Sequence, residues 1–249
     1  MPDFAHPSRF DTPVFVTGLP RSGTSLVAGC LTTCGLWTGT IVPANPFNPK
    51  GYFEHAVIRE QIVKPILAGS RVDPLGVAPL PPEDFAPWPS FAPPGAAALD
   101  LHGILARILK AEGYDGTRPW LYKDTKLTLL WRSFHRAFPA ARWVVVRRPR
   151  ADFIRSCRAT PFMARHSDDP AFWEGFAAAY EARLAQLIEA TGATEIDSAP
   201  LARGDFTGVT ALARSLGLRP DRAALTAFVA PEHWHFGAAA PPKANPPPA

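Results

Sequence analysis

The sequence predicts an α/β protein with three layers, in which helices cover both faces of a central parallel sheet. Apolar runs that indicate buried strands alternate with helical patterns along much of the chain. The run at residues 143–146 is apolar without alternation, which is typical of a strand buried on both faces of a parallel sheet. A glycine-containing loop joins the first predicted strand to the first predicted helix, the layout of a phosphate-binding turn.

The same patterns predict the individual elements in chain order. Strands are expected at residues 13–17, 120–122, 142–147 and 194–196. Helices are expected at residues 24–36, 52–67, 97–111, 127–138, 172–190, 206–216 and 222–229, with a further helix opened by Pro149. The helix at 97–111 has one apolar stripe, formed by Leu101, Ile104, Leu105, Ile108 and Leu109.

Proline and glycine content predicts the segments without regular structure. Residues 74–95 are rich in proline and are expected to form a long surface loop over the site. Residues 1–237 are predicted to be one domain, and residues 238–249, mostly alanine and proline, to be a disordered tail.

Composition narrows the class of ligand. The formal net charge of the 249 residues is only +4, which is too weak to indicate a nucleic acid polymer as partner. Residues 142–158, however, contain six arginines and one acid, Asp152, which favours a pocket for a small anion. The three cysteines make no disulfide framework, and no signal peptide or membrane-spanning run is visible, so we expect a cytoplasmic location.

The loop at residues 18–25 (GLPRSGTS) has the glycine spacing of the nucleotide-triphosphate loop. Backbone N–H groups of such a loop, and of the helix that follows, converge on an anion. Thr24 stands where that motif has its lysine, and the cation is instead Arg21. The loop is therefore expected to hold phosphate without the lysine that reaches the β- and γ-phosphates of ATP.

A second anion site is predicted where the strand at 142–147 ends. Arg148 is followed eight residues later by Ser156, on a helix whose spacing places Asp152 and Ser156 on one face. An arginine fork and a hydroxyl can bind the same anion. Arg147 matches the pattern one residue earlier, so either arginine could fill this role. Parallel strands bring the 18–25 loop, Lys123-Asp124 and Arg147-Arg148 to the same edge of the sheet.

These segments resemble the sulfotransferases that use 3′-phosphoadenosine 5′-phosphosulfate (PAPS). The P-[KR]-S-G-T-[ST] signature of that family is similar to Pro20, Arg21, Ser22, Gly23, Thr24 and Ser25. The arginine and serine that grip the 3′-phosphate are similar to Arg148 and Ser156, and two further motifs, NPKGYFE at 48–54 and YKD at 122–124, follow the family order. The resemblance runs from about residue 13 to 160. It implies the P-loop-like sulfotransferase fold, with these residues binding PAPS.

Sulfuryl transfer would need cations near the leaving 5′-phosphate and a base near the acceptor. Arg21 and Lys123 are the candidate cations, and Glu54 is the candidate base, with His55 as the alternative. Glu54 could instead cap the helix that follows it. Asp124 is expected to orient Lys123 or Arg148. No metal is expected, since no paired acids suited to magnesium are visible.

The acceptor is not legible in the sequence. It could be a small molecule, a saccharide or a peptide, with Trp37 and Trp88 as candidate lining residues, and the oligomeric state is equally open. Two other functions fit the loop less well. A P-loop kinase would need the missing lysine and an acid for magnesium, and a non-catalytic nucleotide-binding protein would not need Arg21, Glu54 and Lys123.

Overall fold

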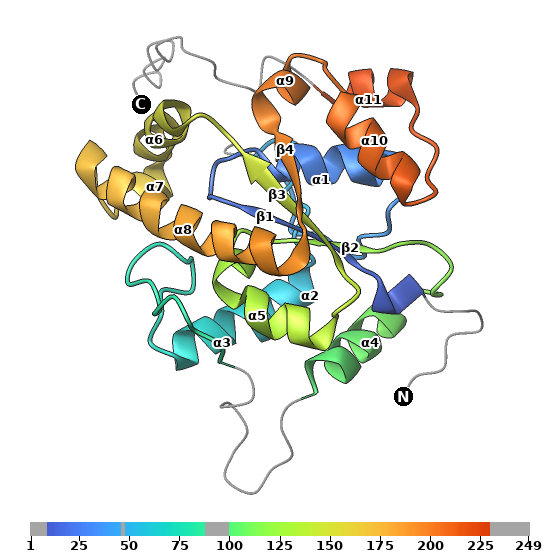
Figure 1. Cartoon of the computed structure of the whole chain (residues 1–249), viewed down its shortest axis with the longest axis horizontal. Helices are drawn as coiled ribbons and strands as arrows, with labels where there is room; N and C mark the ends of the chain where they lie inside the picture. Colours follow the sequence, from blue (N-terminus) through green and yellow to red (C-terminus); the bar gives the residue numbers. More distant parts are fainter. Residues whose placement is uncertain (1–8, 46–47, 88–99, 230–249) are drawn as a thin grey trace, which may run out of the picture.

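One parallel sheet forms the centre of the molecule. The computed structural model describes residues 9–45, 48–87 and 100–229. Within them, strands β1 (Val14–Gly18), β2 (Leu121–Lys123), β3 (Arg142–Arg147) and β4 (Thr194–Asp197) pair in parallel in the order β2-β1-β3-β4 (Figure 1). Val14 of β1 pairs with Leu121 on one side and Arg142 on the other. The predicted parallel sheet is confirmed.

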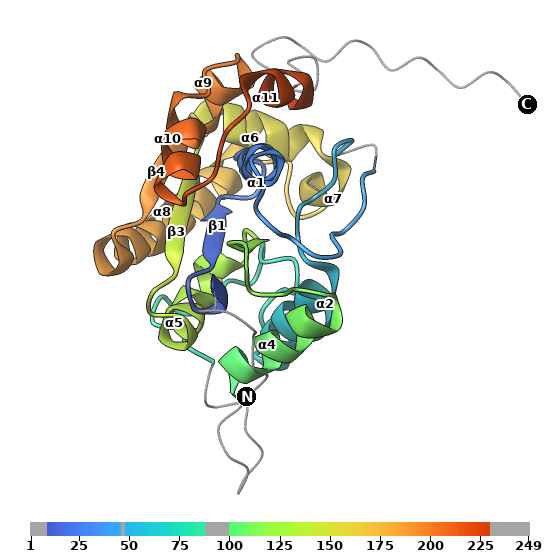
Figure 2. The same ribbon diagram turned by 90° about the vertical axis from the view of Figure 1, so that its right-hand side faces the viewer.

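Helices cover both faces of this sheet, because both faces of its strands are apolar. Val14 and Val16 belong to one buried cluster, and Phe15, between them, belongs to another. The first cluster is covered by α1 (Thr24–Thr33), α9 (Ser198–Ala202), α10 (Thr207–Ser215) and α11 (Arg222–Phe228). The second is covered chiefly by α5 (Leu127–Ala137) and α8 (Pro170–Thr191) (Figure 2). The fold is therefore the predicted three-layer α/β/α arrangement.

Seven further helical elements complete the described part of the chain. They are η1 (Arg9–Asp11), α2 (Ala56–Ile58), the π-helical turn η2 (Arg59–Val63), α3 (Lys64–Gly69), α4 (Leu101–Ala111), α6 (Arg150–Ala159) and α7 (Pro161–Ala164). The short helices α7 and α9 were not anticipated from the sequence. No helix in the described part of the chain is long and apolar enough to cross a membrane.

The helix expected at residues 52–67 begins only at Ala56, and runs through α2, η2 and α3. Gly51 and Phe53 have φ angles of 89° and 55°, so the chain cannot be helical there. His55 then caps the helix, since its side chain accepts a hydrogen bond from the Ile58 N–H group. The alternative role considered for Glu54, helix capping, is thus filled by the next residue.

The proline-rich loop is anchored where the structure describes it. The Tyr180 hydroxyl donates to the Gly76 carbonyl oxygen at 2.7 Å, and Arg183 donates to the carbonyl oxygen of Pro81. Arg132 of α5 donates to the carbonyl oxygen of Glu83 at 2.6 Å. Residues 76–83 are therefore held against α5 and α8 rather than lying loosely on the surface. Residues 88–95, Trp88 among them, and the tail at 238–249 fall outside the described residues.

Candidate active site

The 18–25 loop turns sharply between β1 and α1. Gly18 lies so close to β3 that a Cβ atom there would be 2.6 Å from the carbonyl oxygen of Val146. Arg21 adopts a left-handed backbone with φ of 65°, a conformation that L-residues rarely hold. Gly23, with φ of 93°, precedes α1, and no side chain caps that helix. The first N–H groups of α1 are therefore available to an anion.

The second predicted anion site meets this loop directly. The Nε group of Arg21 donates to the Ser156 hydroxyl at 3.2 Å, although the two residues are 135 positions apart. Arg148 donates from Nη1 to the carbonyl oxygen of Arg21 at 2.7 Å. The sheet edge and α6 thus bring Arg21, Arg148 and Ser156 together, as the sequence predicted.

The cationic groups here are pressed together and partly withdrawn from water. Burial lowers the pKa of Arg148 to about 10; Asp152 opposes this, and the neighbouring charges of Arg21 and Arg155 add to it. Burial also lowers the pKa of Arg21. Such a cluster is stabilised by a bound anion, since each guanidinium is destabilised by its neighbours. Arg147 is not part of it: its Nε group donates to Glu195 at 2.6 Å, outside the cavity.

One cavity of about 620 Å³ joins these groups, a volume within the usual range for ligand pockets. Of the six loop residues predicted to bind the donor, five line it: Pro20, Arg21, Gly23, Thr24 and Ser25. Ser22 is the exception, because its side chain is buried and does not reach the cavity wall. Arg148 and Ser156 also line the cavity, and so do the two remaining candidates, Glu54 and Lys123.

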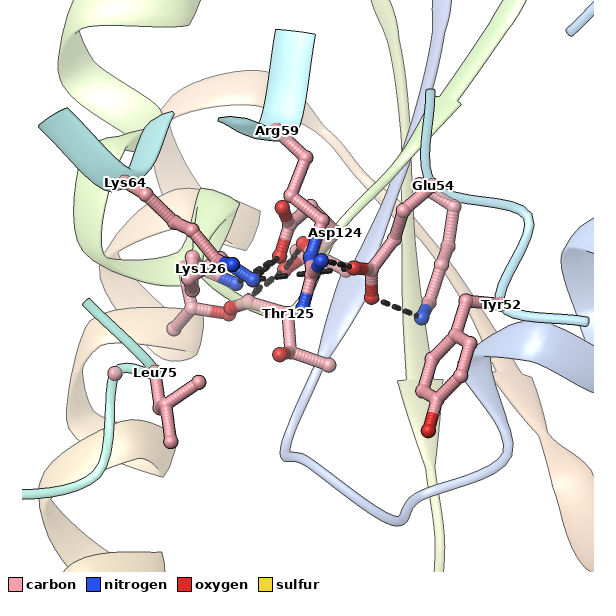
Figure 3. A network of polar contacts seen from close by, with 12 residues as sticks. Tyr52, Glu54, Arg59, Lys64, Leu75, Asp124, Thr125 and Lys126 are labelled. Atoms are coloured by element: carbon pink, nitrogen blue, oxygen red, sulfur yellow. Dashed lines mark hydrogen bonds and ion pairs between the residues drawn. The ribbon is translucent and has the colours of Figure 1, made fainter. Parts of the chain in front are cut away.

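Glu54 lies at the centre of a buried ion-pair network (Figure 3). Its carboxylate is 2.8 Å from Lys123 Nζ, 2.7 Å from Arg59 Nε and 4.0 Å from Lys126 Nζ. Burial alone would raise the pKa of Glu54, but the three cations outweigh it and lower the pKa to about 2. Glu54 is therefore ionised at any ordinary pH, and in this pairing it is a weak base.

Asp124 has a different role from the one expected. It orients neither Lys123 nor Arg148. Its carboxylate lies 2.7 Å from Lys126 Nζ and accepts a hydrogen bond from the Tyr122 hydroxyl at 2.9 Å. Asp124 is fully buried and holds Lys126, which lines the cavity.

Arg59 and Lys126 are the functional candidates that sequence reasoning missed. Lys126 lies three positions after Lys123, just beyond the strand end, a spacing that could have indicated a second cation at the same edge. Arg59 lies five positions after Glu54, across a backbone turn and a helix start, so no simple periodicity connects them.

Two other candidates point away from the cavity. His55 is buried, with Nε2 at 3.5 Å from the Glu112 carboxylate and Nδ1 on the helix. Trp37 packs against His55 and Tyr114, with ring centroids 6.2 Å and 4.9 Å away. Neither lines the cavity, so Glu54 is the better placed of the two candidate bases.

The segment at 48–54 joins the start of α1 to the end of α11 beside the cavity. The Ser25 hydroxyl donates to the carbonyl oxygen of Tyr52 at 3.2 Å and accepts from the Asn48 amide at 3.0 Å. Lys50 donates to the carbonyl oxygen of Phe228 and lies 4.9 Å from the centroid of its ring. The described residues contain no group of three or more side chains that could hold a metal ion.

Two comparisons relate the chain to known proteins. A profile of the sulfotransferase family matches residues 13–198, which is most of the chain. Among solved structures, the chain is similar to the sulfotransferase STF1 from Mycobacterium tuberculosis, with 16% identity and a TM-score of 0.50, over 86% of this chain and 70% of that one. At that identity the likeness shows the fold alone, and no curated protein matches. Since the profile covers most of the chain, and every cavity-lining residue except Ala202, Phe228 and Val229, the chain belongs to the sulfotransferase family.

Proposed function

We propose that the protein transfers a sulfuryl group from PAPS to a hydroxyl or amine of an acceptor. The observation that carries the proposal is the direct link between the two anion sites. Arg21 bonds Ser156, and Arg148 bonds the Arg21 backbone, within one cavity. A nucleotide with phosphate groups at both its 5′ and 3′ positions matches two cationic sites held this closely.

The transfer would proceed as an in-line displacement. A bond forms between the acceptor oxygen or nitrogen and sulfur, while the bond from sulfur to the bridging oxygen breaks and its electron pair stays on the 5′-phosphate. Arg21 and the N-terminus of α1 would stabilise the charge that grows on this leaving group. Lys123 is the second cation at the same cavity.

The acceptor proton would leave through Glu54. Its carboxylate lines the cavity, whereas the ring of His55 does not. Lys123 competes for this carboxylate at 2.8 Å and lowers its basicity. Glu54 would therefore act best on an acceptor that is already acidic, or when Lys123 turns toward the donor.

Binding of adenosine 3′,5′-bisphosphate, measured by calorimetry, tests the proposal. We expect micromolar or tighter binding, and a loss of about 10- to 100-fold in Arg148→Ala, the value of a charged hydrogen bond to phosphate. Arg147→Ala is the matched control and should bind normally, because Arg147 pairs with Glu195 outside the cavity. A folded wild-type protein that does not bind the bisphosphate would contradict the proposal.

A kinase is the competing function. It would bind ATP with magnesium through a lysine that is absent here, since Thr24 occupies that position. A thermal shift that needs ATP and magnesium, with none from the bisphosphate, would favour a kinase.

A further inference from the structure

One apolar side chain stands out at the rim of the cavity. Among the described residues, Leu75 is the exposed large hydrophobic side chain, with 40% of its surface accessible. It lines the same cavity as Glu54 and Lys126 (Figure 3). A single exposed leucine is unremarkable by itself, so its support and its neighbours decide what it means.

The turn that carries Leu75 is rigidly held. The Asp73 carboxylate accepts hydrogen bonds from the N–H groups of Leu75 at 2.9 Å and Val77 at 3.0 Å. The Gly76 carbonyl oxygen accepts from the Tyr180 hydroxyl at 2.7 Å, and a Cβ atom at Gly76 would lie 3.0 Å from that hydroxyl. Leu75 is therefore held at a defined position beside the cavity, and such preorganisation lowers the cost of ordering a side chain when a ligand binds.

Helix α7 continues this wall. His166, just after α7, lies 4.0 Å from the Asp73 carboxylate, so the turn and the helix are neighbours. Phe162 and Met163 of α7 line the cavity as well. Leu75, Phe162 and Met163 form what we call the apolar wall, and Glu54, Lys123 and Lys126 are the polar groups of the same cavity.

The charges of the cavity leave no cation for a charged acceptor. Seven cationic side chains line the cavity, namely Arg21, Lys50, Arg59, Lys123, Lys126, Arg148 and Arg155. Glu54 and Asp152 line the same cavity, and Asp124 pairs with Lys126 beneath it, so four positive charges remain. Outside the cavity, Glu60 pairs with both Lys64 and Arg59, and the charges of Glu60 and Lys64 cancel. PAPS carries about four negative charges at neutral pH, two on the 3′-phosphate and two on the phosphosulfate.

We propose, on the basis of the sulfuryl transfer proposed above, that the acceptor is an uncharged phenol. Its ring packs on the apolar wall, and its hydroxyl lies at Glu54 and Lys123. The phenolic oxygen bonds to sulfur, the bond from sulfur to the 5′-phosphate oxygen breaks, and the phenolic proton passes to Glu54 and on to water.

Acidity supports a phenol over an alkanol. A phenolic hydroxyl has a pKa of about 10, far below that of an alcohol, so it asks less of a weak base. The ammonium groups of Lys123 and Lys126 stabilise the phenolate as it forms.

Three acceptors of nearly equal shape test the proposal, with transfer measured as labelled sulfuryl product. 4-Propylphenol is the expected substrate. 3-(4-Hydroxyphenyl)propanoate adds a carboxylate, and 4-propylcyclohexanol replaces the phenol by an alkanol. We expect kcat/KM for 4-propylphenol to exceed each of the others by about 100-fold. Equal or reversed preference would overturn the proposal.

Variants of Leu75 connect this preference to the wall. Leu75→Ser should lower kcat/KM for 4-propylphenol by about 10-fold, mainly through KM, because apolar contact is lost. Leu75→Lys should shift the ratio toward the carboxylate acceptor by about 10-fold, since it adds the missing cation. Both variants should bind adenosine 3′,5′-bisphosphate like the wild type, which separates loss of the wall from loss of the fold.

The outcomes also separate the two proposals. The protein could bind the bisphosphate and transfer sulfuryl groups to saccharides or alkanols but not to phenols. That result would overturn the proposal of a phenolic acceptor and leave the proposal of sulfuryl transfer intact. Absence of bisphosphate binding overturns both. Unchanged acceptor ratios in the two Leu75 variants would exclude Leu75 as a selectivity residue and would overturn the role of the apolar wall in choosing the acceptor.

Discussion

The two ends of the cavity hold similar cations in opposite electrostatic states. Around Arg21 and Arg148 the guanidinium groups repel one another, and burial lowers the pKa of both. Around Glu54, two buried carboxylates neutralise two of the three cations, Arg59, Lys123 and Lys126. The first end is completed by an anion from outside, whereas the second is largely neutralised within the protein. Positive side chains therefore serve to bind an anion at the Arg21–Arg148 end and to stabilise the fold at the Glu54 end.

The largest effect should come from breaking the balanced end. Glu54→Gln leaves Lys123, which is 3% exposed, without its carboxylate, and an unpaired buried charge costs about 3–5 kcal/mol. We expect that loss in the free energy of unfolding measured with urea. Glu60→Gln is the matched control, because Glu60 also pairs with Arg59 but is exposed, and it should cost less than about 1 kcal/mol. Equal losses in the two variants would show that the network is not structural.

Breaking the anion end should affect catalysis instead. Arg21→Ala should lower kcat by about 10²- to 10³-fold, because a preorganised donor at the leaving group is lost. Its free energy of unfolding should change little or improve, since one of the mutually repelling cations is removed. Arg158→Ala, an exposed arginine of α6, is the control and should retain full activity. Retained activity in Arg21→Ala would remove Arg21 from the mechanism.

The pH dependence of the free energy of unfolding tests the Glu54 end of the cavity separately. The pKa of Glu54 is lowered in the folded protein, from 4.5 to about 2, so its contribution to stability is present above the unfolded value and is lost as the pH falls toward the folded one. Between about pH 5 and about pH 3 the wild type should lose about 2 kcal/mol through this group. Glu54→Gln should lack that part of the loss. Parallel pH curves for the two proteins would contradict the low pKa.

The smallest effect concerns the arginine that sequence could not distinguish from its neighbour. Arg147 pairs with Glu195, and both side chains are substantially exposed, at 34% and 47%. Arg147→Ala should therefore change the free energy of unfolding by less than about 1 kcal/mol and leave transfer intact. A loss of transfer comparable with that of Arg148→Ala would mean that the geometry has been assigned to the wrong arginine.

Sequence reasoning succeeded where a pattern is local. The bounds of β3 agree with prediction, because four consecutive apolar residues are required only where both faces of a strand are covered. On α6, Asp152 and Ser156 both line the cavity, as their spacing indicated, while Phe153, Ile154 and Cys157 are buried. The loop at 18–25 forms where glycine spacing placed it, although the spacing did not show that the Ser22 side chain is buried close to Gly18.

It failed where contacts are distant or compete. Glu54 and Lys123 are 69 positions apart, and nothing local shows that they pair. Asp124 could have met Lys123, Arg148 or Lys126, and only the direction of the chain after β2 selects Lys126. His55, next to the candidate base, is used as a helix cap because the backbone reverses at Phe53.

The Ser25 side chain has a consequence for how the donor is held. A hydroxyl carries a single hydrogen, and that of Ser25 is committed to the carbonyl oxygen of Tyr52. Its oxygen is likewise engaged by Asn48. A phosphate bound at the N-terminus of α1 would therefore contact the main chain of Ser25. The Ser25 side chain instead holds the 48–54 segment in place. Ser25→Ala would therefore loosen the 48–54 segment and would not remove a hydrogen-bond partner of the ligand.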